Sequence, residues 1–277
     1  MGRLFRNPSR TMTSIIMLWV FLGAAVYWQI QRLDEKRIAT NRAAYARHPN
    51  NKFIPPSQIP KINPGAWPPP AGKTVEMAQD LTAANYLIVF DGSFSMNESR
   101  CSGSLTKLQV AKSAVKKFIS ALGPGANVGL VGFGGSPSGK NRNYEHPLVS
   151  GDRTGINNLL DGVRGLGNTP LSRSVFRGFE MLEAQARRQG GYGQYHMVIV
   201  TDGISTDGDP SIMTRNIVER SAIKIHTIGF CINDRHGLNV PGYTRYSTAS
   251  DPGALEAGLR GVLSENDSFD PGVYIKQ

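Results

Sequence analysis

Histidine and cysteine are scarce in this chain of 277 residues, which has five histidines and two cysteines. The histidines form no H-E-x-x-H pattern and no other metal-ligand spacing, so a histidine-ligated zinc centre is not indicated. A G-x-S-x-G motif, which carries the nucleophile of many hydrolases, is also missing. The sequence therefore gives little support to a zinc enzyme or a serine hydrolase.

Acidic residues are the scarcer charge, with 21 Asp and Glu against 31 Lys and Arg, which gives a net charge of +10. The excess is uneven, because residues 1–48 carry a net charge of +6 and the much longer remainder only +4. Nucleic-acid binding usually needs a basic patch on the folded domain, whereas here most of the excess flanks an apolar N-terminal segment. We therefore expect no nucleic-acid partner.

The glycine-rich segment 134–140 nearly forms a phosphate-binding loop, but one required residue is missing. It spells G-x-x-x-x-G-K, and Asn141 stands where a Ser or Thr would hold magnesium. The residues after Asn141 are also a poor start for the helix on which such a phosphate cradle depends. We do not expect a nucleotide site.

An apolar run near the N-terminus predicts a single membrane anchor. Residues 1–10 form a basic tail with three arginines, and residues 11–31 would span roughly 30 Å as a helix, enough for the core of a bilayer. A cleaved signal peptide is the competing interpretation, but no A-x-A cleavage site follows the apolar run. We favour an uncleaved transmembrane helix.

The charges on the two sides of this run do not point to one orientation. Five basic residues follow it within residues 32–47, against three before it, contrary to a simple positive-inside count. The opposite orientation would carry three arginines and a free amine across the membrane, whereas a long C-terminal domain can be exported despite its charges. We expect a cytoplasmic N-terminus and an exported domain, periplasmic or otherwise extracytoplasmic.

A linker, residues 32–83, is expected between the anchor and the domain. Its first part is polar, and prolines then recur up to the triplet at 68–70. Such spacing favours extended polyproline II and a semi-rigid stalk. A ligand for a proline-recognition module is the alternative. The tail at 265–277 is polar and not informative.

Strands and helices alternate through residues 84–264. In the first predicted helix, 105–122, apolar residues share one stripe, and the lysines at 107, 112, 116 and 117 fall largely off it. The alternation predicts an α/β fold, a doubly wound and mainly parallel sheet with one antiparallel edge strand. Apolar runs predict strands at 86–90, 127–133, 144–149, 195–201 and 223–230, and further helices at 156–163, 171–188 and 252–263.

Two of the predicted strands end in aspartate. Asp91 follows the first strand and leads to Ser93 and Ser95, and Asp202 ends the fourth strand. If the first three residues alternate along an extended turn, their side chains share one side and offer hard oxygen ligands to a small divalent cation. Thr169 opens the helix before the fourth strand. Capping of helix starts is the competing interpretation for these hydroxyl and carboxylate side chains.

Together these residues resemble the metal-ion-dependent adhesion site of the von Willebrand factor A (VWA) domain. The family pattern is D-x-S-x-S, then a Thr at a later helix start, then an Asp after the fourth strand, and it is met by Asp91, Ser93, Ser95, Thr169 and Asp202. One departure is Phe94, where the family commonly has Gly, which would alter access to a metal without removing a ligand. The resemblance, which covers residues 84–264, implies bound Mg²⁺, or Mn²⁺ or Ca²⁺, and a partner protein whose acidic side chain takes the open coordination position.

The two cysteines are expected on the same edge of the sheet, because Cys101 follows the metal loop and Cys231 follows the fifth strand. This placement favours a disulfide, which would stabilise the fold by up to roughly 5 kcal/mol in the chain-entropy model. Such a bond needs an oxidising compartment, in agreement with export of the domain. Two unrelated buried thiols are the alternative.

A magnesium-dependent phosphohydrolase of the haloacid dehalogenase type is the main enzymatic alternative, because there too an apolar strand ends in Asp. That chemistry needs a second carboxylate two residues after the nucleophile as acid and base, and Ser93 occupies this position. We therefore predict a membrane-anchored binding module that is not an enzyme and has no small-molecule substrate.

Overall fold

The computed structural model describes residues 67–70, 74–136, 143–232 and 236–264. The predicted N-terminal tail and anchor, most of the predicted linker and the C-terminal tail lie outside the described residues. Within the described ranges, no helix has both the length and the apolar character needed to cross a membrane. The anchor at 11–31 therefore stays a prediction.

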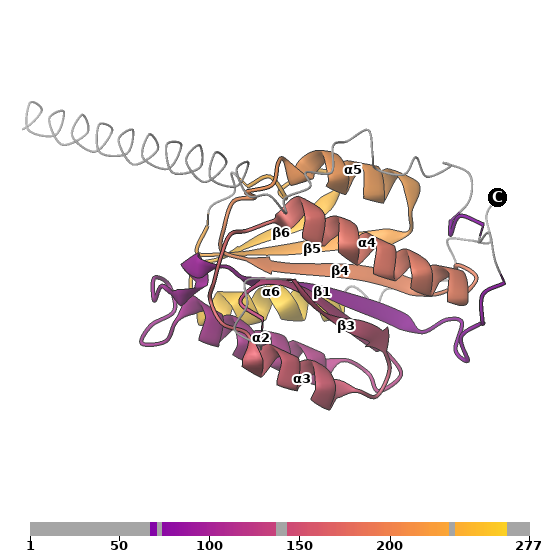
Figure 1. Ribbon diagram of the computed structural model, residues 1–277, viewed down its shortest axis with the longest axis horizontal. Coiled ribbons are helices and arrows are strands. Elements are labelled where there is room, and N and C mark those ends of the chain that lie inside the picture. Colours follow the sequence, from indigo (N-terminus) through magenta and orange to yellow (C-terminus); the bar gives the residue numbers. More distant parts are fainter. Residues whose placement is uncertain (1–66, 71–73, 137–142, 233–235, 265–277) are drawn as a thin grey trace, which may run out of the picture. The chain divides into compact units, whose positions relative to one another are not determined.

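Six strands form one sheet in the order β3-β2-β1-β4-β5-β6 (Figure 1). Neighbouring strands are parallel except β2 and β3, which pair antiparallel at one edge. This confirms the predicted α/β sheet with mainly parallel strands and one antiparallel edge. The strands are β1 (Ala84–Gly92), β2 (Asn127–Gly134), β3 (Tyr144–Val149), β4 (Gln194–Thr201), β5 (Ile223–Phe230) and β6 (Thr244–Ala249).

Helices cover both faces of the sheet (Figure 1). One face carries α2 (Lys107–Ala121), α3 (Arg153–Gly162) and α6 (Pro252–Ser264), and the other carries α4 (Leu171–Arg188) and α5 (Pro210–Arg220). A short 3-10 helix, η2 (Phe94–Asn97), follows β1 directly.

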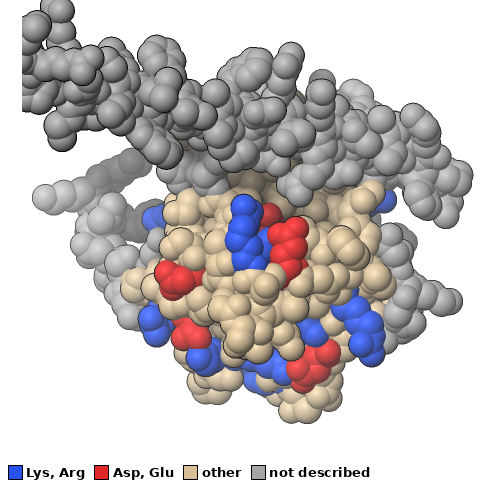
Figure 2. Space-filling view, turned by 90° about the vertical axis from the view of Figure 1, so that its left-hand side faces the viewer, with Lys and Arg blue, Asp and Glu red and all other residues tan. Residues whose placement is uncertain are grey.

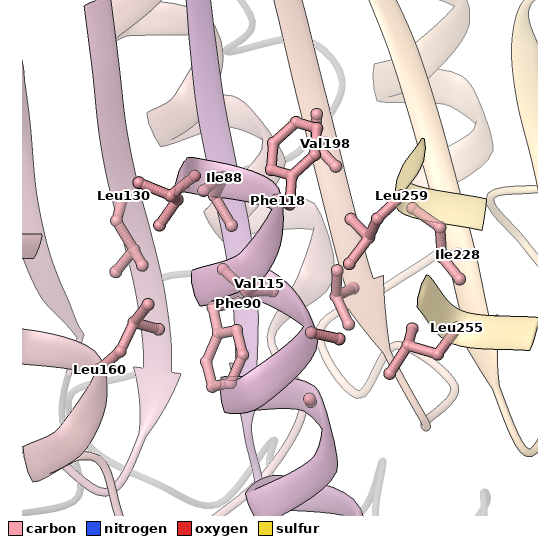
Figure 3. Close-up of a cluster of buried hydrophobic side chains, with 14 of the residues drawn as sticks. Ile88, Phe90, Val115, Phe118, Leu130, Leu160, Val198, Ile228, Leu255 and Leu259 are labelled. Carbon is pink, nitrogen blue, oxygen red and sulfur yellow. The ribbon is translucent and has the colours of Figure 1, made fainter. Parts of the chain in front are cut away.

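Strand β1 lies at the centre of the sheet and is buried on both faces. Its alternate side chains divide between two apolar clusters: Ile88 and Phe90 pack with α2, α3 and α6, and Leu87 and Val89 pack with α4 and α5. Figure 3 shows the first cluster, where Val115 of α2 lies over this part of the sheet. Burial on both faces explains why the strand is a continuous apolar run and not an alternating one.

One strand was missed from the sequence. Strand β6 has the sequence TRYSTA and follows β5 in parallel at the second edge of the sheet. Most of its side chains are only partly buried, so it carries no apolar run that would predict a strand. Its backbone pairing with β5, from Ile225 to Phe230, is what defines it.

The described end of the linker contacts the domain at the amino end of the sheet. Trp67 packs against Phe179 and edge-on against Tyr195, with ring centroids 6.2 and 5.9 Å apart. Nε of Arg187 also donates a hydrogen bond to the carbonyl oxygen of Pro69 at 3.3 Å. Because Tyr195 is the second residue of β4, the chain enters the domain at the end opposite the carboxyl ends of the strands.

A histidine pair is buried in the sheet between β4 and β5. Nδ1 of His196 and Nε2 of His226 are 3.2 Å apart, and both residues are at most 3% exposed. Burial lowers the pKa of His226 from 6.5 to about 3, with the positive charges of His196, Arg245 and Lys224 acting in the same direction. The folded state therefore holds His226 neutral.

We expect acid to destabilise the fold through His226. In the unfolded chain this side chain takes up a proton near pH 6.5, so its contribution to stability is complete above that pH and is lost as the pH falls toward 3. The loss is at most about 1.4 kcal/mol per pH unit. Urea unfolding at pH 7.5 and 4.5 should show a smaller loss for His226→Gln than for wild type. Equal losses in the two proteins would show that another group is responsible.

Candidate metal centre

The carboxyl ends of β1 and β4 bring the two predicted aspartates to one edge of the sheet. The two strands pair in parallel, with Phe90 opposite Val200, so Asp91 and Asp202 leave neighbouring strands at the same end. Both are buried, at 0% and 6% exposure. The topology therefore produces the convergence that the sequence predicted.

Hydrogen bonds connect these aspartates to the two serines. Oγ of Ser95 donates to Oδ1 of Asp202 at 2.7 Å, and the Oγ atoms of Ser93 and Ser95 lie 3.1 Å apart. On the other side, the backbone N–H of Ser93 donates to Oδ1 of Asp91 at 2.8 Å. Oγ1 of Thr201 donates to Oδ2 of Asp91 at 2.6 Å. The four predicted residues thus form one continuous cluster of oxygen atoms.

The loop after β1 is not the extended turn expected from the sequence. Ser93 is extended, with φ −67° and ψ 169°, but the 3-10 helix η2 begins at Phe94 and contains Ser95. The turn of this helix still brings the two serine hydroxyls together. It also directs Phe94 outward, where its side chain is 68% exposed.

The capping interpretation is wrong for the loop after β1. Ser93 precedes η2 but makes no side-chain cap hydrogen bond, and helix α2 is capped by Thr106 instead. Oγ1 of Thr106 accepts from the backbone N–H of Gln109, whose side chain accepts in return from the backbone N–H of Thr106. The side chains of Asp91, Ser93 and Ser95 are therefore not used to start α2.

Thr169 lies beside the aspartate after β4 and does not cap α4. A Cβ placed on Gly203, the residue after Asp202, would be 3.1 Å from Oγ1 of Thr169. The loop after β4 and the segment before α4 therefore approach closely next to Asp202. The N-cap residue of α4 is Pro170, whose side chain makes no capping hydrogen bond. The structure thus places all five predicted residues at one edge of the sheet.

Asp207 supplies the cap that Thr169 does not. Its Oδ1 and Oδ2 accept hydrogen bonds from the backbone N–H groups of Ser172 and Arg173 in the first turn of α4, at 3.0 and 2.9 Å. Ser205 donates a third hydrogen bond to it at 2.8 Å. This carboxylate comes from a loop distant in sequence, so helix-start patterns within α4 gave no sign of it.

Lys107 is a further residue of the site that the sequence did not predict. Its Nζ donates hydrogen bonds to Oδ2 of Asp202 and to Oε2 of Glu98, both at 2.8 Å. The side chain is 2% exposed although its spacing placed it largely off the apolar stripe of α2. It is the first residue of the helix, where its ammonium group contacts Glu98 of the preceding loop and Asp202 after β4, and helical periodicity does not take account of such contacts.

Burial and a neighbouring negative charge act on the carboxylate of Asp91. Burial, and then the negative charge of Asp202, raise the pKa of Asp91 from 3.8 to about 7. A bound cation would lower this pKa, because its positive charge stabilises the ionised carboxylate.

The donor set fits a hard divalent cation. Two carboxylates and three hydroxyl groups provide only oxygen ligands, which Mg²⁺, Mn²⁺ and Ca²⁺ prefer over nitrogen or sulfur. Over the described ranges, no cluster of three His, Cys, Asp or Glu residues of metal-binding geometry occurs. A cation at this edge would therefore depend on the serine and threonine hydroxyls and on water.

The predicted disulfide is present at the same edge of the sheet. Cys101 and Cys231 are bonded, with their Cα atoms 5.8 Å apart and a sequence separation of 130. The bond connects the loop between η2 and α2 to the end of β5. The described part of the chain has no free cysteine.

Figure 2 views the molecule from the left of Figure 1, the edge at which β1 and β4 end. In the part of this face that grey atoms leave visible, Lys and Arg side chains alternate with Asp and Glu side chains, and neither sign forms a large continuous patch. This surface is unlike the basic face of a nucleic-acid-binding domain.

Comparison with known proteins supports a VWA domain in this chain. The family model described as the von Willebrand factor type A domain matches residues 86–204. The uncharacterized protein YwmC of Bacillus subtilis (strain 168) is 28% identical over 160 residues, which cover 53% of this chain and 66% of that protein.

Solved structures share the fold at low sequence identity. The pilus adhesin SpaC of Lactobacillus rhamnosus GG, in its open conformation, matches with a TM-score of 0.53 and 19% identity over 69% of this chain and 30% of that chain. A von Willebrand factor type A protein of Catenulispora acidiphila matches with a TM-score of 0.51 and 17% identity, over 65% of this chain and 42% of that one. The chain thus spans less than two thirds of the length of the relatives that it matches.

Proposed function

We propose that this chain is a membrane-anchored binding module that captures an acidic side chain of a partner protein through a divalent cation, in assembly or adhesion at the cell envelope. Asp91, Ser93 and Ser95 would hold the cation, with Thr169 and Asp202 acting directly or through water. The observation that carries this proposal is the convergence of these side chains at one edge of the sheet.

A cation held by these residues would allow the site to bind an anion, which the residues alone would repel. Asp91 and Asp202 are both acidic, so without a cation they repel a partner carboxylate. When bound, the cation supplies a coordination position that such a carboxylate can enter. The hydrogen bond from Ser95 to Asp202 connects the η2 loop to the end of β4 and orients the hydroxyl and carboxylate oxygens. Function is then binding, without turnover.

The position of the linker supports presentation of this site to a partner. The described linker end contacts the amino end of the sheet through Trp67 and Pro69, so the candidate site faces away from it. The disulfide at the same edge agrees with an oxidising, extracytoplasmic location.

The hydrolase alternative has no support at this site. Haloacid dehalogenase chemistry needs a carboxylate two residues after the nucleophile, and Oγ of Ser93 stands there, 3.1 Å from Oγ of Ser95. A hydroxyl paired with a second hydroxyl is a poor acid or base near neutral pH.

We expect partner capture to require the cation. The full chain, tagged and purified from native membranes after crosslinking, should recover a partner protein when Mg²⁺ is present during crosslinking, and should lose most of it when a chelator is added before the crosslinker. Substituting the partner's contacting Asp or Glu by Ala should then have the same effect as the chelator. Recovery of the same proteins at the same yield with chelator would contradict cation-dependent capture.

A further inference from the structure

Each carboxylate of the candidate site has one oxygen held by a residue outside the predicted ligand set. Oδ2 of Asp91 accepts the hydrogen bond of Thr201, and Oδ2 of Asp202 accepts that of Lys107. This leaves Oδ1 as the atom that each carboxylate turns toward the serines, to the N–H of Ser93 and the hydroxyl of Ser95. Each oxygen keeps a second lone pair, but a cation bound by both oxygens of Asp202 would lie close to the ammonium group of Lys107, whose charge would repel it.

The position of Lys107 is fixed by the start of α2. Thr106 and Gln109 cap this helix reciprocally, and the backbone N–H of Lys107 donates to the carbonyl oxygen of Glu98 at 2.9 Å. The ammonium group lies between Glu98, whose side chain is 51% exposed, and Asp202, whose side chain is 0% exposed. Lys107 therefore contacts Oδ2 of Asp202, whereas Ser95 contacts Oδ1, and the capped start of α2 fixes the backbone of Lys107.

Stability alone does not account for a lysine at this position. Taking an ammonium and a carboxylate out of water is unfavourable for each ion, and well-packed apolar residues often stabilise a fold as much as a buried ion pair does. A cation site, in contrast, gains from a fixed donor that orients one of its carboxylates, because coordination geometry depends on the outer hydrogen bonds of the ligands.

We propose that Lys107 is a positioning residue that opposes binding of a cation by both oxygens of Asp202 and so gives the site a preference for Mg²⁺ or Mn²⁺ over Ca²⁺. Mg²⁺ needs six oxygen ligands in near-octahedral geometry and retains several waters, whereas Ca²⁺ takes six to eight and often binds both oxygens of a carboxylate. The ammonium charge also reduces the negative charge of the site, which weakens its attraction for every divalent cation. This inference rests on the proposed cation site.

Replacing Lys107 by Met tests the proposal. Met keeps a long unbranched side chain and removes the donor and the charge. Titration calorimetry on the purified, metal-free full chain should show both cations binding more tightly to K107M, with the affinity for Ca²⁺ relative to Mg²⁺ increased on the order of tenfold. K117M is the matched control: it removes a lysine from the same helix whose side chain is 63% exposed and pairs with Glu256, and its affinities should equal those of wild type.

The outcomes separate this inference from the proposed function. If wild type binds neither Mg²⁺ nor Ca²⁺, the cation site itself is wrong. If wild type binds Mg²⁺ and K107M shows an unchanged ratio of the two affinities, the role of Lys107 is wrong and the site remains. K107R, which restores a charged donor, should return the ratio toward that of wild type.

A crystal structure of the wild-type chain with Mn²⁺ decides the question if K107M does not fold. Nζ of Lys107 should remain on Oδ2 of Asp202, and Asp202 should contact the cation, or its water, through Oδ1 only. A cation bound by both oxygens of Asp202, with Lys107 displaced, would overturn the proposal.

Discussion

Asp91→Asn should abolish the response of the protein to divalent cations and, without a cation, should stabilise the fold. Asp91 is buried and its pKa is raised to about 7, so its ionised form is unfavourable in the folded state. Without cation, the contribution of Asp91 to the free energy of unfolding should fall as the pH rises from about 4 through 7, opposite in sign to the contribution of His226. At pH 8 the Asn variant avoids this cost and should be more stable than cation-free wild type by on the order of 2 kcal/mol.

The local hydrogen bonds allow this substitution. Oδ1 of the new amide can accept from the N–H of Ser93, as Asp91 does, and its NH₂ group can donate to Oγ1 of Thr201. The hydroxyl of Thr201 can then donate to the carbonyl oxygen of Gly203, which is 3.3 Å away. The variant therefore loses the negative charge and keeps its partners.

Adding Mg²⁺ should reverse the order of stability. At a cation concentration of 100 times Kd, wild type gains about 2.7 kcal/mol, whereas the Asn variant gains essentially nothing. Thermal unfolding of both proteins with and without Mg²⁺ measures these differences in stability. The Asn variant should also lose partner capture. Asp209→Asn is the control: Asp209 lies in the loop after β4 and caps α5, where Asn is an equally good cap. A cation response retained by the Asp91 variant would show that Asp91 is not a ligand.

Removing the disulfide should cost the domain about 2–5 kcal/mol. Cys101 and Cys231 close a loop of more than one hundred residues, which includes β2, β3, β4 and the helices between them, so the bond restricts the unfolded chain strongly. For a domain of this size the midpoint of thermal unfolding should fall by about 5–15 °C in the double variant Cys101→Ser, Cys231→Ser. Cation affinity should fall as well, because the loop carrying Glu98 is then held less firmly.

Wild type treated with a reductant provides the matched comparison, since it has the native sequence without the bond. Its unfolding midpoint should approach that of the double Ser variant, and the two should show the same cation affinity. An unchanged midpoint in both would mean that the bond adds nothing to stability.

The core elements of the fold followed from the sequence because the central strands are buried on both faces and the helices along one stripe. β1, β5 and α4 contain continuous or periodic apolar residues, and these patterns predicted their positions closely. β6 was missed because an edge strand with half-exposed polar side chains is defined by pairing with β5, and α3 begins before its apolar residues because Asp152 caps it. Both depend on contacts that a local pattern does not contain.

The sequence by itself determined the acidic strand ends and the residue types of the site, because strand burial and ligand chemistry are local properties. Only the tertiary structure decided which group contacts each carboxylate oxygen. Thr201 and Lys107 each hold one oxygen of a carboxylate, and Asp207 takes the helix-capping role that would have competed for Thr169. These contacts join segments up to 110 residues apart, which meet because β1 and β4 are neighbours in the sheet.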